Sequence, residues 1–244
     1  MQKVFHKKLI AIFSVCLALI VGFVSAIILC AQALSVPVPV AAQNTELKIV
    51  VDAGHGGVDG GVVGKNGTKE SDLNLAVSLQ LKGLLEEAGF EVTLTRKTSS
   101  GLYGMPTKGF KKRDMLKRKE IIENAAPDLV LSIHQNFYPA SSARGAQVFY
   151  NAKNARSQTL AQCLQTQLND EYQKQGVKSR VEKSGEYYIL QCTDAPTVIV
   201  ECGFLSNAKD EALLKSDDFK RKLCSSVVAG VLQYLQAQGA AGFA

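Results

Sequence analysis

Several residue types are scarce or missing in this 244-residue chain, which has no tryptophan, three histidines, three methionines and six prolines. No internal repeat and no low-complexity tract is visible, which argues against a solenoid or a disordered chain. Hydrophobic residues make up 46% of the sequence and charged residues 20%. The part that follows the first 46 residues is long enough for one domain with a substantial core.

The cysteines lack any CxxC spacing, which argues against a cysteine zinc site. Two of the six, Cys16 and Cys30, lie in a long apolar segment near the N-terminus. The other four are Cys163, Cys192, Cys202 and Cys224. Apolar neighbours, such as those before Cys202, favour buried free thiols, although an external location would also permit disulfides. The sequence leaves their redox state open.

Charge is only mildly biased, with 28 basic and 22 acidic residues and a formal charge of +6. The densest basic patch comprises Lys108, Lys111, Lys112, Arg113, Lys117, Arg118 and Lys119. It can be a solvated loop and helix face, or it can attract an anionic polymer or lipid head groups outside the cell. Phe110 is the single aromatic residue interleaved with these charges, so we expect no nucleic-acid partner.

The N-terminal segment from Leu9 to Leu34 contains no charged residue, and it is long enough to cross a bilayer as a helix. Three lysines precede it, which predicts a cytoplasmic N-terminus and an extracytoplasmic domain. We expect residues 1–34 to be a signal peptide or a transmembrane anchor. Ala31-Gln32-Ala33 resembles a cleavage site, but the apolar run exceeds the usual signal-peptide core, which favours an uncleaved anchor over secretion. Residues 35–46, with Pro37 and Pro39, read as a linker.

Strand-like and helix-like segments alternate over residues 47–238, which we take as the catalytic domain, with 239–244 as a tail. Expected strands cover 47–51, 91–95, 128–133, 145–150, 187–191 and 197–200, and expected helices cover 73–85, 113–124, 155–172 and 218–236. Continuous apolar strands that alternate with helices predict an α/β fold. In such a fold a twisted, mostly parallel sheet carries helices on both faces.

Four chemically active side chains fall at the element ends where α/β proteins bind ligands. His55 follows the first strand, His134 follows the third, Glu201 follows the last, and Glu70 opens the first helix. A lone histidine at a strand end is usually structural, and Glu70 could simply suit a helix N-terminus. Two imidazoles and one carboxylate together, however, form the open zinc site of hydrolases. We therefore predict that one Zn²⁺ ion binds His55, Glu70 and His134.

Glu201 is the candidate general base, because it ends a run of apolar residues whose desolvation should raise its pKa. The alternative role for Glu201 is a carboxylate that caps a neighbouring helix. Asp52 is a candidate for orienting a ligand histidine, and Asn136 for contacting substrate. Glycines around His55 give a tight loop, but a phosphate-binding loop is disfavoured because neither GxxxxGK[ST] nor GxGxxG is present.

Four linked motifs resemble those of the zinc-dependent N-acetylmuramoyl-L-alanine amidases of the amidase 3 type. They are Val51-Asp52-Ala53-Gly54-His55-Gly56-Gly57-Val58-Asp59-Gly60, Lys69-Glu70, Ser132-Ile133-His134-Gln135-Asn136 and Val200-Glu201-Cys202-Gly203-Phe204-Leu205-Ser206-Asn207. The resemblance extends from Leu47 to about Leu235. One departure is Cys202, where the family usually has valine; since cysteine is small and apolar, we expect no loss of activity.

This resemblance implies a six-stranded sheet, one zinc ion on His55, Glu70 and His134, and a catalytic Glu201. The implied reaction is hydrolysis of the amide between N-acetylmuramic acid and L-alanine in peptidoglycan. Within the family, the N-terminal anchor and the stretches 104–110 and 145–150 are most like the germination-specific amidases of spore-forming bacteria. Those relatives act on spore cortex and work with a separate deacetylase that makes muramic-δ-lactam.

Two alternatives stay open at this stage. One is a general vegetative autolysin of the same family, and the other is a catalytically silent wall-binding regulator with the same fold. An activating protein partner is a further hypothesis, because a small domain with an exposed metal site can need a partner to order it.

Overall fold

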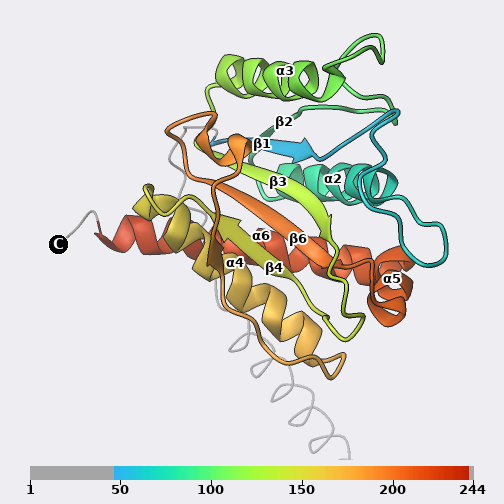
Figure 1. Ribbon diagram of the computed structural model, residues 1–244. Helices are drawn as coiled ribbons and strands as arrows, with labels where there is room; N and C mark the ends of the chain where they lie inside the picture. Colours follow the sequence, from blue (N-terminus) through green and yellow to red (C-terminus); the bar gives the residue numbers. More distant parts are fainter. Residues whose placement is uncertain (1–46, 242–244) are drawn as a thin grey trace, which may run out of the picture. The chain divides into compact units, whose positions relative to one another are not determined.

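One six-stranded sheet organises the computed structural model, which describes residues 47–241 (Figure 1). The strand order is β2-β1-β3-β6-β4-β5. All neighbouring strands run parallel except β4 and β6, which pair antiparallel. The strands are β1 (Lys48–Ala53), β2 (Glu91–Leu94), β3 (Leu129–Asn136), β4 (Gln147–Tyr150), β5 (Lys183–Ser184) and β6 (Thr197–Phe204). The predicted α/β class with a six-stranded, mostly parallel sheet is confirmed.

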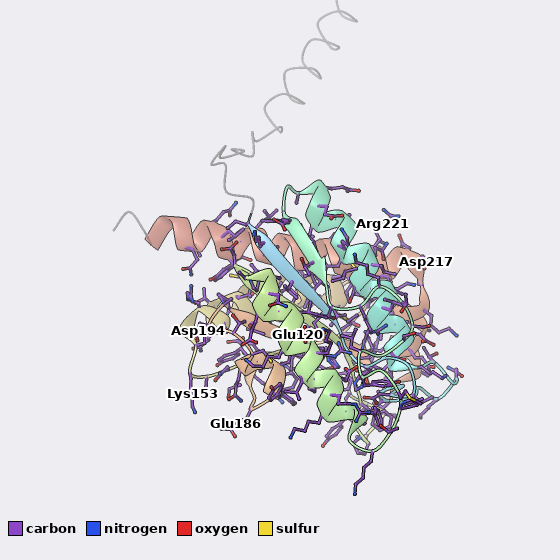
Figure 2. All side chains as sticks on the ribbon, turned by 90° about the horizontal axis from the view of Figure 1, so that it is seen from above. Glu120, Lys153, Glu186, Asp194, Asp217 and Arg221 are labelled. Atoms are coloured by element: carbon purple, nitrogen blue, oxygen red, sulfur yellow. The ribbon has the colours of Figure 1, made fainter. Side chains whose placement is uncertain are left out.

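The helices divide unequally between the two faces of the sheet. They are α2 (Glu70–Glu87), α3 (Phe110–Ala125), α4 (Ala155–Gln173), α5 (Ala208–Lys215), α6 (Asp217–Ala241) and the 3-10 helix η1 (Tyr188–Gln191). Residues of α2, α4 and α6 form the larger core with one set of strand residues. The opposite face carries a smaller core, to which α3 and η1 contribute Ile122, Ile189 and Leu190. In Figure 2, seen from above, α3 lies in front of the sheet, with Glu120 labelled on it.

The alternating direction of side chains along each central strand decides which of the two cores a residue joins. In β1, Ile49 and Val51 belong to the larger core, whereas Val50 belongs to the smaller one. In β6, Val198 and Val200 join the larger core and Ile199 the smaller. Because successive side chains of a strand point to opposite faces, a strand buried on both sides is apolar throughout, as these sequences are.

The segment from residue 187 to 191 does not form the strand that its apolar residues predict, since residues 188–191 are helix η1. Ile189 and Leu190 are consecutive and both belong to the smaller core. A strand would send them to opposite faces, whereas one turn of 3-10 helix lets both pack under the same layer. Strand β5 was not predicted, because it is two exposed residues long and carries no periodic pattern.

Helix α5 was also missed, although Asn207 caps it by accepting hydrogen bonds from the backbone of Lys209 and Asp210. The last helix, α6, continues to Ala241 and so includes part of the expected tail 239–244. The predicted signal or anchor segment 1–34 and linker 35–46 lie outside the described residues. Over residues 47–241, no helix has both the length and the apolar character that a membrane crossing needs.

Candidate active site

The register of the central strands brings the predicted side chains onto one face. Asp52 in β1 pairs with Ser132 in β3. Two residues further along β3, His134 pairs with Glu201 in β6. Asp52, His134 and Glu201 share the parity of Val50, Val130 and Ile199, which form the smaller core. These side chains therefore point to the α3 side of the sheet, beyond the carboxyl ends of three parallel strands.

Local backbone geometry places the other two predicted ligands. His55 follows β1 with φ of 59°, a left-handed conformation that is uncommon for a residue other than glycine. Glu70 is the first residue of α2, and its side chain is buried. Gly54 allows close approach, because a Cβ there would lie 2.2 Å from the His134 ring. The loop, the helix and strand β3 thus bring His55, Glu70 and His134 together.

The three potential ligand atoms lie within 4.8 Å of one another. His55 Nε2 is 3.3 Å from Glu70 Oε1, and His134 Nδ1 is 2.9 Å from the same oxygen. The two imidazoles meet edge to face at 77°, with ring centroids 5.0 Å apart. Two neutral imidazole nitrogens and one carboxylate at this spacing can hold a single divalent metal ion and leave a coordination position open.

Glu70 is held by groups that neutralise or hydrogen-bond both carboxylate oxygens. The backbone N–H of Gln135 donates to Oε1 and that of Val62 donates to Oε2, at 3.1 Å and 2.9 Å. Burial alone would raise the pKa of this carboxyl, but hydrogen bonds and charge from His134 and His55 outweigh it and lower the pKa. Glu70 is therefore ionised at neutral pH, as a metal ligand must be.

Asp59 is the carboxylate that orients His55, a role that sequence reasoning had suggested for Asp52. Asp59 Oδ2 lies 3.0 Å from His55 Nδ1, the ring nitrogen that faces away from Glu70. This bond fixes the ring and leaves Nε2 toward the cluster, which is how carboxylates usually support metal-binding histidines. The spacing of four residues within the glycine-rich loop was visible in the sequence, but the shape of the loop was not.

Asp52 lies deeper, in a buried network beneath the His55 loop. It accepts hydrogen bonds from Arg118 at 2.5 Å, Thr95 at 2.7 Å and Ser132 at 2.7 Å. Arg118 also donates to the carbonyl oxygens of Ala53 and His55, both at 2.7 Å. No hydrogen bond joins Asp52 to a histidine among the described residues. Asp52 therefore acts on the site through Arg118 and the backbone.

Arg118 does not belong to the solvated basic patch in which the sequence placed it. Its side chain is only 2% exposed, and it pairs with both Asp52 and Asp114. Arg96 is a second buried arginine, and it donates to the carbonyl oxygens of Ala53 and Gly54. Two buried guanidinium groups thus fix the carbonyl groups of Ala53, Gly54 and His55.

We expect the free energy of unfolding to fall by about 2 kcal/mol as the pH drops from 4 to 2, because Asp52 becomes protonated. Burial would raise its pKa, but Arg118, Ser132 and Thr95 together lower it from 3.8 to about 2. A carboxyl whose pKa is lowered in the folded state stabilises the protein above its unfolded pKa, and this contribution disappears on acidification. Urea titrations across this range measure the slope; Asp52→Asn should flatten it, and an unchanged slope would contradict the assignment.

Tyr103 is a further residue that sequence reasoning missed. Its hydroxyl oxygen accepts a hydrogen bond from the backbone N–H of Val58 at 2.6 Å, and its ring is buried. A Cβ at Gly57 would lie 2.1 Å from that hydroxyl, so glycine is needed there for contact. The polar segment between β2 and α3 therefore supports the His55 loop through one aromatic residue.

Glu201 faces a pocket of about 430 Å³ that opens over the cluster. The pocket is lined by His55, His134, Glu201, Asp59, Lys111, Met115, Tyr187, Tyr188, Ile189, Ile199, Arg118, Asp52, Asp114 and Gly54. Glu201 Oε2 is buried and has no hydrogen-bond partner among the described residues. Desolvation raises the pKa of this carboxyl to about 7, as its apolar surroundings predict. An unpartnered carboxylate beside the cluster is suited to proton transfer.

Asn136 is the predicted site residue that the structure leaves outside the pocket lining. It follows a register shift in the pairing of β3 with β6, and its carbonyl oxygen accepts a hydrogen bond from Leu205 at 2.8 Å. Its role toward substrate remains a prediction. Cys163, Cys192, Cys202 and Cys224 are free and buried, which agrees with the interpretation as buried thiols.

Comparisons with known proteins agree with this site. Residues 49–233 match the family Amidase_3, described as N-acetylmuramoyl-L-alanine amidase. The chain is 33% identical over 194 residues to the germination-specific N-acetylmuramoyl-L-alanine amidase of Bacillus subtilis, covering 78% of this chain and 81% of the relative. It is 27% identical over 228 residues to the amidase AmiA of Escherichia coli, covering 76% of this chain and 75% of AmiA.

Solved structures give the same result. The CwlD amidase of Clostridioides difficile, determined in complex with the GerS lipoprotein, is 36% identical with a TM-score of 0.74. The alignment covers 78% of this chain and 99% of CwlD. The catalytic domain of CwlV from Bacillus (Paenibacillus) polymyxa var. colistinus is 29% identical with a TM-score of 0.68, covering 78% and 98%. The chain therefore belongs to the amidase 3 family, and it is an N-acetylmuramoyl-L-alanine amidase that acts on peptidoglycan.

Proposed function

We propose that this enzyme is a zinc amidase of the spore cortex, with Zn²⁺ bound by His55, Glu70 and His134 and with Glu201 as the catalytic acid and base. The observation that carries the proposal is the meeting of three ligand atoms within 4.8 Å at the edge of the pocket that Glu201 also lines. When bound there, zinc supplies Lewis acidity at the amide carbonyl and makes water a stronger nucleophile at neutral pH.

The residues of the chain divide the remaining work. Glu201 takes the proton from the attacking water and then gives it to the nitrogen of L-alanine as the carbon–nitrogen bond breaks. The products are the free lactyl carboxylate on the sugar and a peptide with a free amino terminus. Asp59 holds the imidazole of His55, and Arg118 and Arg96 hold the backbone of its loop. These contacts hold the His55 loop in the position that the reaction needs.

The cortex as substrate is supported by the germination-specific relative and by the CwlD neighbour. We infer that the enzyme removes peptides so that a deacetylase can convert the bare muramic acid to muramic-δ-lactam. It acts outside the cytoplasm, where we place it by an anchor within residues 9–34. The CwlD structure contains the GerS lipoprotein, and we propose a protein partner for this chain as well.

Digestion of purified spore-cortex and vegetative sacculi with the full-length enzyme should release peptides that begin with L-alanine, identified by mass spectrometry. Deletion of the gene should give spores that lack muramic-δ-lactam and germinate poorly, while vegetative cells separate normally. A defect in cell separation with normal cortex would instead identify a vegetative autolysin. If neither substrate released peptides, the amidase mechanism would be rejected for the isolated chain.

A further inference from the structure

Lys111 is a pocket residue that the mechanism described so far does not use. It lies in the first turn of α3, where its Nζ is 3.3 Å from Asp59 Oδ1. Its side chain is 68% exposed, and it lines the same pocket as His55 and Glu201. An ammonium group has three donors, and the contact with Asp59 uses one of them. The other donors face solvent at the mouth of the active site.

The charges around the pocket single out Lys111 as the group that can meet an anion. Asp52 and Asp114 both accept hydrogen bonds from the buried Arg118 and are thereby compensated. Glu201 faces the pocket as the proposed acid and base. Among the described lining residues, the two cations are Arg118, which is 2% exposed, and Lys111. Among the described lining residues, Lys111 is therefore the accessible cationic side chain for a negatively charged part of a substrate that enters the pocket.

Lys111 lies close enough to the cluster to contact the part of a stem peptide that follows L-alanine, because one carboxylate, Asp59, bridges it to His55. Asp59 contacts His55 through one oxygen and Lys111 through the other. The ammonium thus lies one imidazole ring and one carboxylate away from the ligand nitrogen of His55. In an extended peptide, the carboxylate on the residue after L-alanine lies roughly 7 Å from the scissile carbonyl, a distance of two residues. Lys111 and His55 line the same pocket, so one extended peptide can contact both.

We propose that Lys111 binds the free α-carboxylate of the second stem-peptide residue, an isoglutamate, and so selects peptidoglycan in which this group is not amidated. The inference rests on the proposed function, because it assumes that the scissile amide is held at the His55–Glu70–His134 cluster. The substrate carboxylate approaches Lys111 from the solvent side while Asp59 remains on His55. Lys111 is thus a specificity residue, and it takes no part in bond cleavage.

Steady-state kinetics on two matched peptidoglycan fragments test this role. One fragment carries isoglutamate and the other isoglutamine at the second position, and both are made by muramidase digestion. Lys111→Gln should lower kcat/KM on the isoglutamate fragment about tenfold, mainly through KM, because one charge-assisted hydrogen bond is lost. Its kinetics on the isoglutamine fragment should stay unchanged, and Lys111→Arg should restore most of the preference.

Lys112 provides the matched control, because it is the next residue of α3, is exposed and does not line the pocket. Lys112→Gln should leave both substrates unaffected. Equal losses on both fragments in Lys111→Gln would mean that Lys111 acts only through Asp59, and unchanged kinetics would mean that it does not contact substrate; either result overturns the inference. If the wild-type enzyme cleaves the isoglutamate fragment, the proposed amidase function stands whatever the Lys111 variants show, whereas failure to cleave both fragments overturns both proposals.

Discussion

Replacing Glu201 with glutamine should lower kcat for peptide release by about a thousandfold, within the range that general acid–base catalysis contributes. Glutamine keeps the shape of the side chain but can neither accept the proton from water nor return it to the leaving amine. The carboxylate oxygen Oε2 is buried and has no hydrogen-bond partner in the part of the chain that the structure describes. Release of free amino termini from sacculi measures the loss.

Zinc content separates this catalytic loss from a loss of the metal site. Glu201→Gln should retain one zinc ion per chain by atomic absorption, because the proposed ligands are untouched. Glu186→Gln is a suitable control, since Glu186 is an exposed glutamate just before the pocket residue Tyr187 and does not itself line the pocket. Full activity in Glu201→Gln, with Glu186→Gln also active, would disprove the assigned acid and base.

His134→Ala should reduce zinc affinity by more than about 100-fold, beyond the loss that a supporting residue normally causes. It removes one of the three proposed ligand atoms and opens a cavity where the ring lies against Gly54. The variant should bind less than one zinc ion per chain and release no peptide at metal concentrations that saturate the wild type. Competition with a chelating dye measures the affinity, and full zinc occupancy with normal affinity would contradict the proposed ligand set.

Asp59→Asn should have a smaller effect in the same measurement of zinc affinity. The amide can still hydrogen-bond to His55 Nδ1, but the carboxylate charge that supports the ring is lost. Zinc affinity should fall about 10- to 100-fold, less than in His134→Ala, and excess zinc should restore activity. A loss in Asp59→Asn equal to that in His134→Ala would mean that Asp59 is itself a ligand.

The ends of the strands could be predicted from sequence because composition changes abruptly there. Apolar runs that stop at His55, His134 and Glu201 place these residues at one edge of a parallel sheet whatever the details of the loops. The register that sets His134 beside Glu201 then follows from strand pairing. This local information was enough to predict which side chains meet.

The supporting residues could not be predicted in the same way, because they act across long sequence separations. Arg118 reads as one more charge in a basic helix, and only packing shows that it is buried against Asp52, 66 residues away. Tyr103 lies in a segment with no apolar period, yet its ring is buried. Asp59 was overlooked because the left-handed turn at His55 directs the ring toward it. Such contacts depend on loop shape, which residue periodicity does not encode.

The carbonyl groups of residues 53, 54 and 55 each accept a hydrogen bond from a buried side chain, contributed by Arg118, Arg96 or Asn74. These three donors come from different segments, and all of their bonds are made within the polypeptide. The turn that presents His55 is consequently set by the protein alone. We therefore expect the polypeptide to acquire its final form before it binds the proposed zinc ion, and we expect removal of that ion with a chelator to be reversible.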